Sequence, residues 1–264
     1  VDVLWIGARS TVNPFTVQEI ADALRGVNIP VMVKNPLNPD LSLWIGALER
    51  INHAGITKLA AIHRGFSSFK KTAFRNEPMW EIALQLKTVC PQLPIINDPS
   101  HISGNSELIP YIAQKALDLD MQGLMIESHH NPTIAQTDAK QQLTPTALLD
   151  IVNTLKIRSV ESSDSTFVDK LTELRQEIDK IDDQIIQKMA DRMHIVSQIG
   201  AYKRDSGITI FQLNRWDEII TKRQVFAQAL QLAPDFTSKL LELMHNESIR
   251  KQTEVMNDKS AVEK

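Results

Sequence analysis

Hydrophobic residues recur at alternating spacings of four and three along residues 166–204, which predicts one long helix with a single apolar seam. A seam of this kind is typical of a helix that packs against a partner helix. We therefore expect a homodimer formed through this helix. The seam begins with Phe167, Leu171, Leu174, Ile178, Ile181 and Ile185.

The seam then becomes cationic, because the same spacing reaches Arg192 and Lys203. The helical repeat places these two side chains on nearly the same face, roughly 16 Å apart along the axis. We interpret the pair as a binding site for one small anion. Arg175 lies about 25 Å before Arg192 along the axis, so only an antiparallel copy of the helix brings it to that site. The alternative is that these cations are solvated, as Lys and Arg usually are.

Two shorter amphipathic segments, 214–231 and 236–256, complete an all-α domain of three helices over residues 167–257. Residues 159–166 are polar and without periodicity, which predicts a linker. Thr166 with Asp169 predicts a capping box at the start of the long helix, and we expect a disordered tail over 258–264. The positions expected to face inward on the shorter helices are Ile219, Ile220, Phe226, Ala227 and Leu230, and Leu240, Leu241, Leu243, Met244 and Ile249.

Residues 1–158 follow a different pattern, in which short apolar runs alternate with helical stretches. This alternation is typical of βα units and a parallel sheet. The sequence therefore predicts an α/β plus all-α protein, with five βα units of an incomplete (β/α)8-type barrel before the helical domain. The runs are 3–6, 30–33, 58–62, 94–96 and 123–126, and the helical stretches are 16–24, 41–51, 79–89, 106–119 and 146–155.

Polar residues follow each apolar run, and the carboxyl ends of parallel strands open on one face of a barrel. Three of these residues, Arg9, Lys34 and Arg64, suit a ligand that carries a phosphate and a carboxylate. His101, Glu127 and Asp138 offer the mixed nitrogen and oxygen set of a divalent transition metal. The alternatives are a surface arginine, a turn-capping histidine and an N-capping aspartate. We place His63, His129 and His130 beside the site or on the surface.

Composition narrows the function classes. The 264 residues carry a net charge of −3 with a pI near 6.2, which predicts neither a nucleic acid nor a membrane partner. The single cysteine, Cys90, suits a reducing cytoplasm. Residue 1 is Val, and residues 1–6 already have the pattern of a buried strand, so we expect the chain to begin inside a domain.

The first half resembles the C-terminal βα units of 3-deoxy-D-arabino-heptulosonate 7-phosphate (DAHP) synthase, in its shorter type I form. The resemblance covers about residues 1–157. It rests on Trp5-Ile6-Gly7-Ala8-Arg9, Val33-Lys34-Asn35, Ile62-His63-Arg64-Gly65-Phe66, Asn97-Asp98-Pro99-Ser100-His101, Gly123-Leu124-Met125-Ile126-Glu127-Ser128-His129 and Thr137-Asp138.

This resemblance implies a condensation of phosphoenolpyruvate with erythrose 4-phosphate at a divalent metal of the Mn, Fe, Co or Zn class. Arg9, Lys34 and Arg64 would hold phosphoenolpyruvate. His101, Glu127 and Asp138 would bind the metal. The family also has a Cys ligand and a Lys-Pro-Arg-Thr motif, and both precede the point where this sequence starts. We therefore expect the barrel half to be inactive without those strands.

The second half resembles the all-helical chorismate mutases over about residues 167–256. The matching motifs are Leu174-Arg175-Gln176-Glu177-Ile178-Asp179, Asp191-Arg192, Gly200-Ala201-Tyr202-Lys203, Asn214-Arg215, and Ser248 with Gln252. The resemblance implies that Arg175 of the partner and Arg192 bind the substrate carboxylates. Lys203 and Gln252 would reach the ether oxygen, and Arg215 and Ser248 would line the pocket. Gln212 and Trp216 stand where relatives use acidic residues.

Together the two resemblances imply a fused enzyme of aromatic amino-acid biosynthesis with small-molecule substrates. Conversion of chorismate to prephenate is unimolecular, so cations and a neutral amide suffice and no nucleophile is needed. No cofactor is expected for the mutase site. The alternative is that the helical domain is a non-catalytic dimerisation module that senses prephenate or chorismate and regulates the barrel, which the departures at Gln212 and Trp216 keep open.

Overall fold

The computed structural model describes residues 1–69, 71–159, 161–211 and 213–257, without the side chains of residues 213–215, 217 and 218. It divides into two compact units, Val1–Glu161 and Ser162–Lys264. We call these unit 1 and unit 2 and describe each by itself. The predicted tail 258–264 and Gln212 lie outside the described residues.

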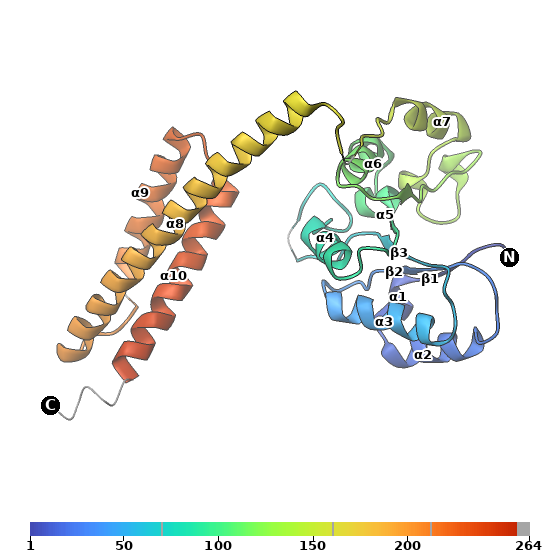
Figure 1. Ribbon diagram of the computed structural model, residues 1–264. Helices are drawn as coiled ribbons and strands as arrows, with labels where there is room; N and C mark the ends of the chain where they lie inside the picture. Colours follow the sequence, from blue (N-terminus) through green and yellow to red (C-terminus); the bar gives the residue numbers. More distant parts are fainter. Residues whose placement is uncertain (70, 160, 212, 258–264) are drawn as a thin grey trace. The chain divides into compact units, whose positions relative to one another are not determined.

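Unit 1 is built on a parallel sheet whose strands follow the order of the chain (Figure 1). Every predicted apolar run contributes a strand, so the α/β prediction is confirmed. The last strand is shorter than predicted, although Met125 N still donates a hydrogen bond to Asn97 O. The strands are β1 (Leu4–Ile6), β2 (Val31–Lys34), β3 (Leu59–His63), β4 (Ile95–Asn97) and β5 (Gly123–Leu124).

Helices connect the strands, and several of them begin at capping side chains. Asn13 accepts hydrogen bonds from the backbone N–H groups of the first turn of α2, and Asp40 and Thr144 do so for α3 and α7. Two short helices that follow strands directly, α1 and α5, were not predicted. The elements are α1 (Ala8–Thr11), α2 (Pro14–Ala23), α3 (Leu41–His53), α4 (Trp80–Val89), α5 (Pro99–Ser103), η1 (Ser106–Leu108), α6 (Ile109–Asp118), η2 (Pro132–Ile134), η3 (Ala139–Gln141) and α7 (Pro145–Thr154).

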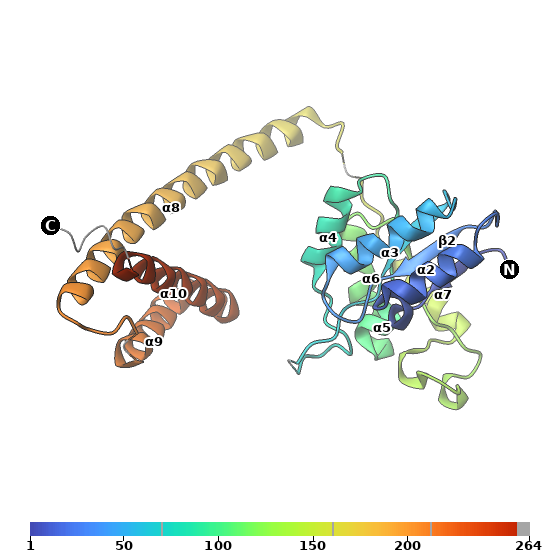
Figure 2. The same ribbon diagram turned by 90° about the horizontal axis from the view of Figure 1, so that it is seen from below.

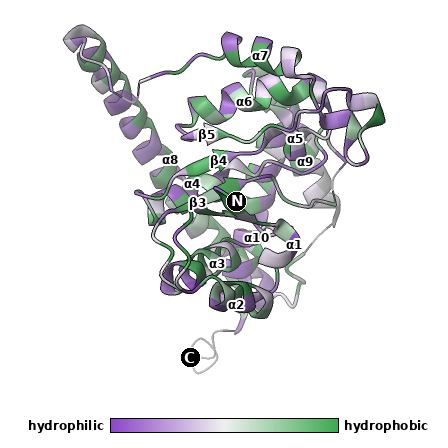
Figure 3. Cartoon of the chain, turned by 90° about the vertical axis from the view of Figure 1, so that its right-hand side faces the viewer, coloured by the Kyte–Doolittle hydropathy of each residue, from purple (hydrophilic) through white to green (hydrophobic). Residues whose placement is uncertain are grey.

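The core of unit 1 lies between the sheet and its helices. Trp44 and Phe66 are fully buried and meet edge to face, with ring centroids 6.5 Å apart. The indole N–H of Trp44 donates to Val33 O, so the largest core side chain also satisfies its polar group. Hydrophobic residues dominate the strands β3 and β4 (Figure 3). Burial of each large side chain stabilises the fold by about 1.5–3 kcal/mol, which holds the strand ends in place.

Unit 2 contains α8 (Ser165–Asp205), α9 (Leu213–Ala229) and α10 (Pro234–Asn257). The three predicted helices are confirmed, but the predicted capping box is wrong. Asp164 caps α8 and accepts from Thr166 N and Phe167 N, so the last two residues of the predicted linker are helical. A carboxylate two residues earlier provides a capping oxygen, as the predicted Thr166 would, and also suits the positive end of the helix dipole.

The C-terminal half of α8 packs along α10, while its first turns extend beyond α9 and α10 (Figures 1 and 2). At Gly200 a Cβ atom would lie 3.3 Å from Gln252 Cα, so glycine allows the two helices to approach closely. In the first half of α8 the predicted seam is exposed in the single chain. Phe167, Leu174, Ile178, Ile181 and Ile185 expose 45–56% of their surface.

Three positions predicted to face inward on the shorter helices are also exposed in the single chain, namely Phe226, Leu230 and Leu243. Apolar surface of this extent is typical of a helical unit that packs against another copy. Among the described helices, none combines the length and the apolar composition needed to cross a membrane.

Candidate functional sites

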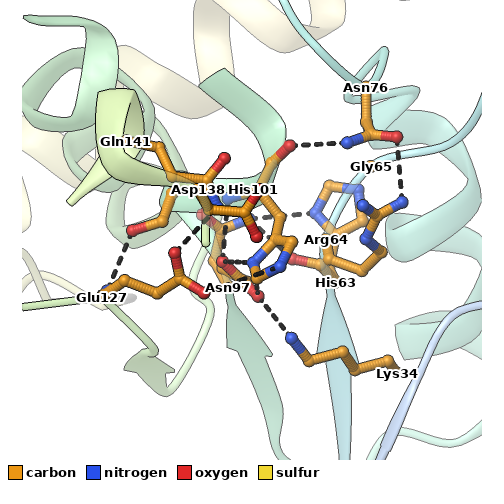
Figure 4. A network of polar contacts seen from close by, with 12 residues as sticks. Lys34, His63, Arg64, Gly65, Asn76, Asn97, His101, Glu127, Asp138 and Gln141 are labelled. Carbon is orange, nitrogen blue, oxygen red and sulfur yellow. Dashed lines mark hydrogen bonds and ion pairs between the residues drawn. The ribbon is translucent and has the colours of Figure 1, made fainter. Parts of the chain in front are cut away.

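Polar side chains at the carboxyl ends of the strands form one network in unit 1 (Figure 4). Lys34 is the last residue of β2, Arg64 follows β3 and Asp98 follows β4. Because the strands are parallel, these three side chains emerge at the same edge of the sheet. Glu127 reaches this edge from the segment after β5.

A buried ion pair lies at the centre of the network. Lys34 Nζ is 2.8 Å from Asp98 Oδ2, with the Asp98 side chain fully buried and the Lys34 side chain 10% exposed. Burial alone raises the pKa of Asp98. The hydrogen bond and charge of His101, together with those of Lys34, outweigh burial and hold that pKa below its usual value. Asp98 therefore stays ionised and links a cation to a histidine.

Asp98 also fixes the orientation of His101. Its Oδ1 accepts from His101 N and caps α5, and its Oδ2 lies 2.8 Å from His101 Nδ1. Nδ1 therefore carries the proton, and Nε2 is left 3.7 Å from Glu127 Oε1. An imidazole oriented by a carboxylate in this way is typical of a metal ligand.

The predicted metal residues come together. His101, Glu127 and Asp138 each offer one ligand atom, and these atoms lie within 4.8 Å of one another. One imidazole nitrogen and two carboxylate oxygens suit a divalent transition metal, so the residues present fit such an ion.

The predicted cations lie beside this cluster. Arg64 is buried, and its Nη1 donates to Asn76 Oδ1 over 2.9 Å. Burial lowers the pKa of Arg64, and the positive charges of Arg75 and Arg9 add to this effect against the attraction of Asp98. Arg9 is exposed on α1. Lys34 and Arg64 therefore form the buried part of a cationic region, with Arg9 on its solvent side.

His63 lies beside the site with its ring completely buried, which is one of the two placements that the sequence left open. Its Nε2 lies 2.6 Å from Pro78 O, which only accepts, and its Nδ1 lies 3.0 Å from Asn97 Nδ2, which only donates. These partners select the neutral ring with the proton on Nε2. Burial lowers the pKa of His63 to about 4.

A second cluster lies between α8 and α10 in unit 2. Arg192 Nη1 donates to Ser248 Oγ over 2.8 Å and approaches Met244 O at 3.4 Å. Gln252 is 8% exposed, and its Oε1 is buried without a hydrogen-bond partner among the described residues. Burial lowers the pKa of Arg192. One turn of α10 thus places the Ser248 hydroxyl on a half-buried guanidinium and Gln252 against Gly200 of α8.

The other predicted residues of this site lie around or away from that cluster. Lys203 is half-buried and donates to Ile210 O. Arg175 is exposed on the first half of α8, about 25 Å along the axis from Arg192. The side chain of Arg215 is not among those described. Trp216 lies against His245 with ring centroids 3.8 Å apart and the rings tilted by 31°. Burial, followed by the charge of Arg192, lowers the pKa of His245.

Sequence comparison gives the relation of the first unit. The model of the DAHP synthetase I family matches residues 1–162, more than half of the chain. The chain belongs to the DAHP synthetase I family. A phospho-2-dehydro-3-deoxyheptonate aldolase from Thermotoga maritima is 28% identical over 155 residues, which are 59% of this chain and 44% of that protein.

Solved structures agree with the DAHP synthetase I assignment. A truncated form of 3-deoxy-D-arabino-heptulosonate 7-phosphate synthase from Thermotoga maritima superposes with a TM-score of 0.51 at 27% identity, covering 58% of this chain and 56% of that one. A crystal structure of the phospho-2-dehydro-3-deoxyheptonate aldolase of the same organism gives the same score and identity over 58% and 44%. The predicted barrel relationship is confirmed.

The second unit matches a different family. The model of chorismate mutase type II covers residues 174–253. T-proteins from Haemophilus influenzae and Enterobacter agglomerans are each 31% identical, over 83 and 81 residues, which are 31% of this chain and 22% of those proteins. This chain therefore joins a DAHP synthase-like domain to a chorismate mutase-type domain. It spans less than half the length of these curated relatives.

Sequence reasoning did not predict a role at this site for four residues that the structure places in its network. They are Asp98, Arg75, Asn76 and Gln141. Asp98 belongs to a motif quoted for that resemblance, and its place directly after a strand was the available signal. Asn76 Nδ2 donates to His101 O over 2.6 Å from a loop 25 residues earlier in the chain. No local sequence pattern marks such a contact, because it depends on how that loop folds back.

Proposed function

We propose that unit 2 converts chorismate to prephenate. The hydrogen bond from Arg192 to Ser248 between two helices, with the buried Gln252 one turn further along α10, is the observation that carries the proposal. Arg192 is partly removed from water, which strengthens its attraction for a carboxylate. Ser248 holds the guanidinium in place, so the cation is oriented before a ligand arrives.

The chemistry of the rearrangement fits these residue types. Chorismate is a dianion that must be held in a compact conformer while negative charge grows on its ether oxygen. Arg192 would bind a carboxylate, and Lys203 and Gln252 would donate to the ether oxygen. Arg215 would line the pocket, and Gln212 would contact the substrate hydroxyl region. None of these steps needs a nucleophile or a cofactor.

The pocket is completed by a second copy of the chain in this proposal. Arg175 lies too far along α8 to join Arg192 within one helix, and the apolar seam next to it is exposed. An antiparallel α8 would cover that seam and bring the partner's arginine to the pocket. A homodimer through α8 therefore accounts for both the exposed residues and the separated cation.

For unit 1 we propose binding of phosphoenolpyruvate and a divalent metal, as in DAHP synthases. Arg9, Lys34 and Arg64 would hold the phosphate and carboxylate, with Asp98 fixing the Lys34 ammonium. His101, Glu127 and Asp138 would hold an ion of the Mn, Fe, Co or Zn class. That ion would supply Lewis acidity toward the aldehyde of erythrose 4-phosphate. A cytoplasmic location stays a prediction.

A second candidate for unit 2 is a module that binds prephenate or chorismate without converting it and regulates the barrel. The contact of Trp216 with His245 favours it, because an aromatic pair stands where relatives carry an acidic residue. Binding would then persist while turnover is lost. The experiment that follows separates the two candidates.

Chorismate consumption by the chain is the test, followed by ultraviolet absorbance. We expect turnover that falls at least 100-fold in Arg192→Ala and in Lys203→Ala, since each removes a charge-assisted contact in the transition state. Lys188→Ala is the matched control, because that lysine lies on the same helix with its side chain 80% exposed. A folded chain that binds prephenate without consuming chorismate would support the sensing module instead.

A further inference from the structure

We propose that Arg75 and Gln141 position the two carboxylate ligands of the metal site, Glu127 and Asp138. This inference rests on the proposed metal binding of unit 1. Neither residue was predicted to take part from the sequence. Gln141 is drawn on the other side of Asp138 and His101 from Lys34 (Figure 4).

Three hydrogen bonds join the carboxylates of two separate segments. Arg75 Nη1 donates to Asp138 Oδ1 over 2.6 Å and to Gln141 Oε1 over 2.7 Å. Gln141 Nε2 then donates to Glu127 Oε2 over 2.8 Å. The charges select this orientation of the amide, because rotation by 180° would place its NH₂ group against the guanidinium and its oxygen against the carboxylate.

The middle residue of this chain is removed from water. Gln141 is 1% exposed, so water does not compete with its two hydrogen bonds. A buried amide whose donor and acceptor are both used has a single favourable orientation. Glu127 is therefore held by a contact that is fixed at both ends.

Arg75 is seated by the helix that carries the histidine ligand. Its backbone N–H donates to Ser103 O, the last residue of α5. Gly104 follows with φ +63°, and a Cβ at that position would lie 2.5 Å from Arg75 Cβ. Only glycine leaves room for this approach. The end of α5 thus fixes Arg75, and α5 also presents His101.

The contacts leave one oxygen of each carboxylate for the metal. Arg75 takes Asp138 Oδ1 and Gln141 takes Glu127 Oε2. Glu127 Oε1 remains on the side of His101 Nε2, at 3.7 Å. Because the ligand atoms are already oriented, the ion does not have to order the carboxylates when it binds. Loss of such outer contacts typically weakens metal binding about 10–100-fold.

Gln141 is the better residue to test, because replacing it changes the contact without changing a charge. Binding of Mn²⁺ and Co²⁺ to the full chain is measured by calorimetry, and the visible spectrum of bound Co²⁺ reports its ligand field. We expect Gln141→Met to weaken binding about 10–100-fold and to alter the Co²⁺ spectrum. Gln18→Met, the same change at an exposed site on α2, should alter neither.

Two further variants keep the proposal falsifiable if Gln141→Met does not fold. Gln141→Glu has nearly the same shape and still accepts from Arg75, but it cannot donate to Glu127, so binding should weaken as well. Arg75→Leu removes the other end of the chain and should misplace Asp138. Near-ultraviolet circular dichroism shows whether each variant keeps the native packing.

His101→Ala separates failure of this inference from failure of the metal site. If the unmutated chain binds no metal, or His101→Ala binds as tightly, then the proposed metal site is wrong and this inference falls with it. If His101→Ala loses the metal while the folded Gln141 and Arg75 variants bind it as tightly as the unmutated chain, then the site stands and the positioning role is wrong.

Discussion

Arg192 on α8 donates a hydrogen bond to Ser248 on α10, with 2.8 Å between Nη1 and Oγ. This contact joins the two helices that form the proposed mutase pocket. It also explains how a cation is tolerated in a seam that is otherwise apolar, because a half-buried guanidinium needs oriented acceptors. Ser248 in turn donates to Met244 O, so the acceptor itself is fixed in the helix.

Replacement of Gln252 should separate activity from stability. Its Oε1 is buried without a partner among the described residues, which costs stability in the unliganded protein. Gln252→Leu removes the amide that would donate to the ether oxygen, and we expect chorismate turnover to fall about 10²–10³-fold. The midpoint of urea unfolding should stay the same or rise. A variant that kept its turnover would remove Gln252 from the catalytic set.

A charge in the exposed seam should break the proposed dimer. Ile181 is 54% exposed in the single chain and would be covered by the partner's α8. Ile181→Glu places a carboxylate in that contact, so we expect a monomer in analytical ultracentrifugation and loss of chorismate turnover together. Lys180→Glu adds negative charge one residue away on an exposed face and serves as the control. A dimeric Ile181→Glu variant would show that another surface mediates assembly.

The buried ion pair of unit 1 should be costly to break. Asp98→Asn leaves the Lys34 ammonium buried without its carboxylate partner. We expect the free energy of unfolding to fall by about 3–5 kcal/mol in urea titrations. Asp22→Asn is the control, because the pair with Arg25 is more than half exposed on both sides and contributes under about 1 kcal/mol. Equal losses of unfolding free energy in the two variants would show that the Lys34–Asp98 pair is no more important to stability than an exposed pair.

His63 should remain neutral at pH values well below the usual pKa of a histidine. Burial lowers its pKa to about 4 from 6.5, so between these values the unfolded chain binds a proton that the folded chain does not. Its contribution to stability is therefore complete above pH 6.5 and is lost as the pH falls toward 4, about 3 kcal/mol in all.

Nuclear magnetic resonance of ring-labelled histidine tests this directly. We expect His63 to show the neutral form with its proton on Nε2 at pH 6 and to titrate near pH 4. The exposed His53 provides a control variant, because His53→Gln removes a histidine and leaves the contacts of His63 with Pro78 and Asn97 in place. An imidazolium signal from His63 at pH 6 would contradict its placement between Pro78 and Asn97.

The strands and helices could be predicted from the sequence where the pattern within a single element determines its structure. Each apolar run became a strand and α8 formed where its periodicity runs, because burial of a face is encoded in adjacent residues. The predicted N-cap of α8 was wrong by two residues. Asp164 and Thr166 both carry a suitable oxygen, and only the path of the chain decides between them.

The candidate sites were predictable only in part. Strand ends identified Lys34, Arg64 and His101, because parallel strands bring their carboxyl ends together. Arg75 and Gln141 were missed, since their contacts cross 63 and 66 residues of chain and depend on a loop that folds over α5. The sequence left open whether His63 lies beside the site or on the surface, because its contact with Pro78 depends on how the segment after β3 folds back.

Complementation between two inactive variants tests the shared mutase pocket most directly. Arg175→Ala and Arg192→Ala are purified separately, shown to be inactive toward chorismate, then mixed under conditions in which dimers exchange. Because a two-fold dimer would pair Arg175 of one chain with Arg192 of the other, half of the sites in each mixed dimer should be intact, and turnover should recover to about a quarter of the unmutated value. No recovery in a mixture shown to contain mixed dimers would contradict the shared pocket.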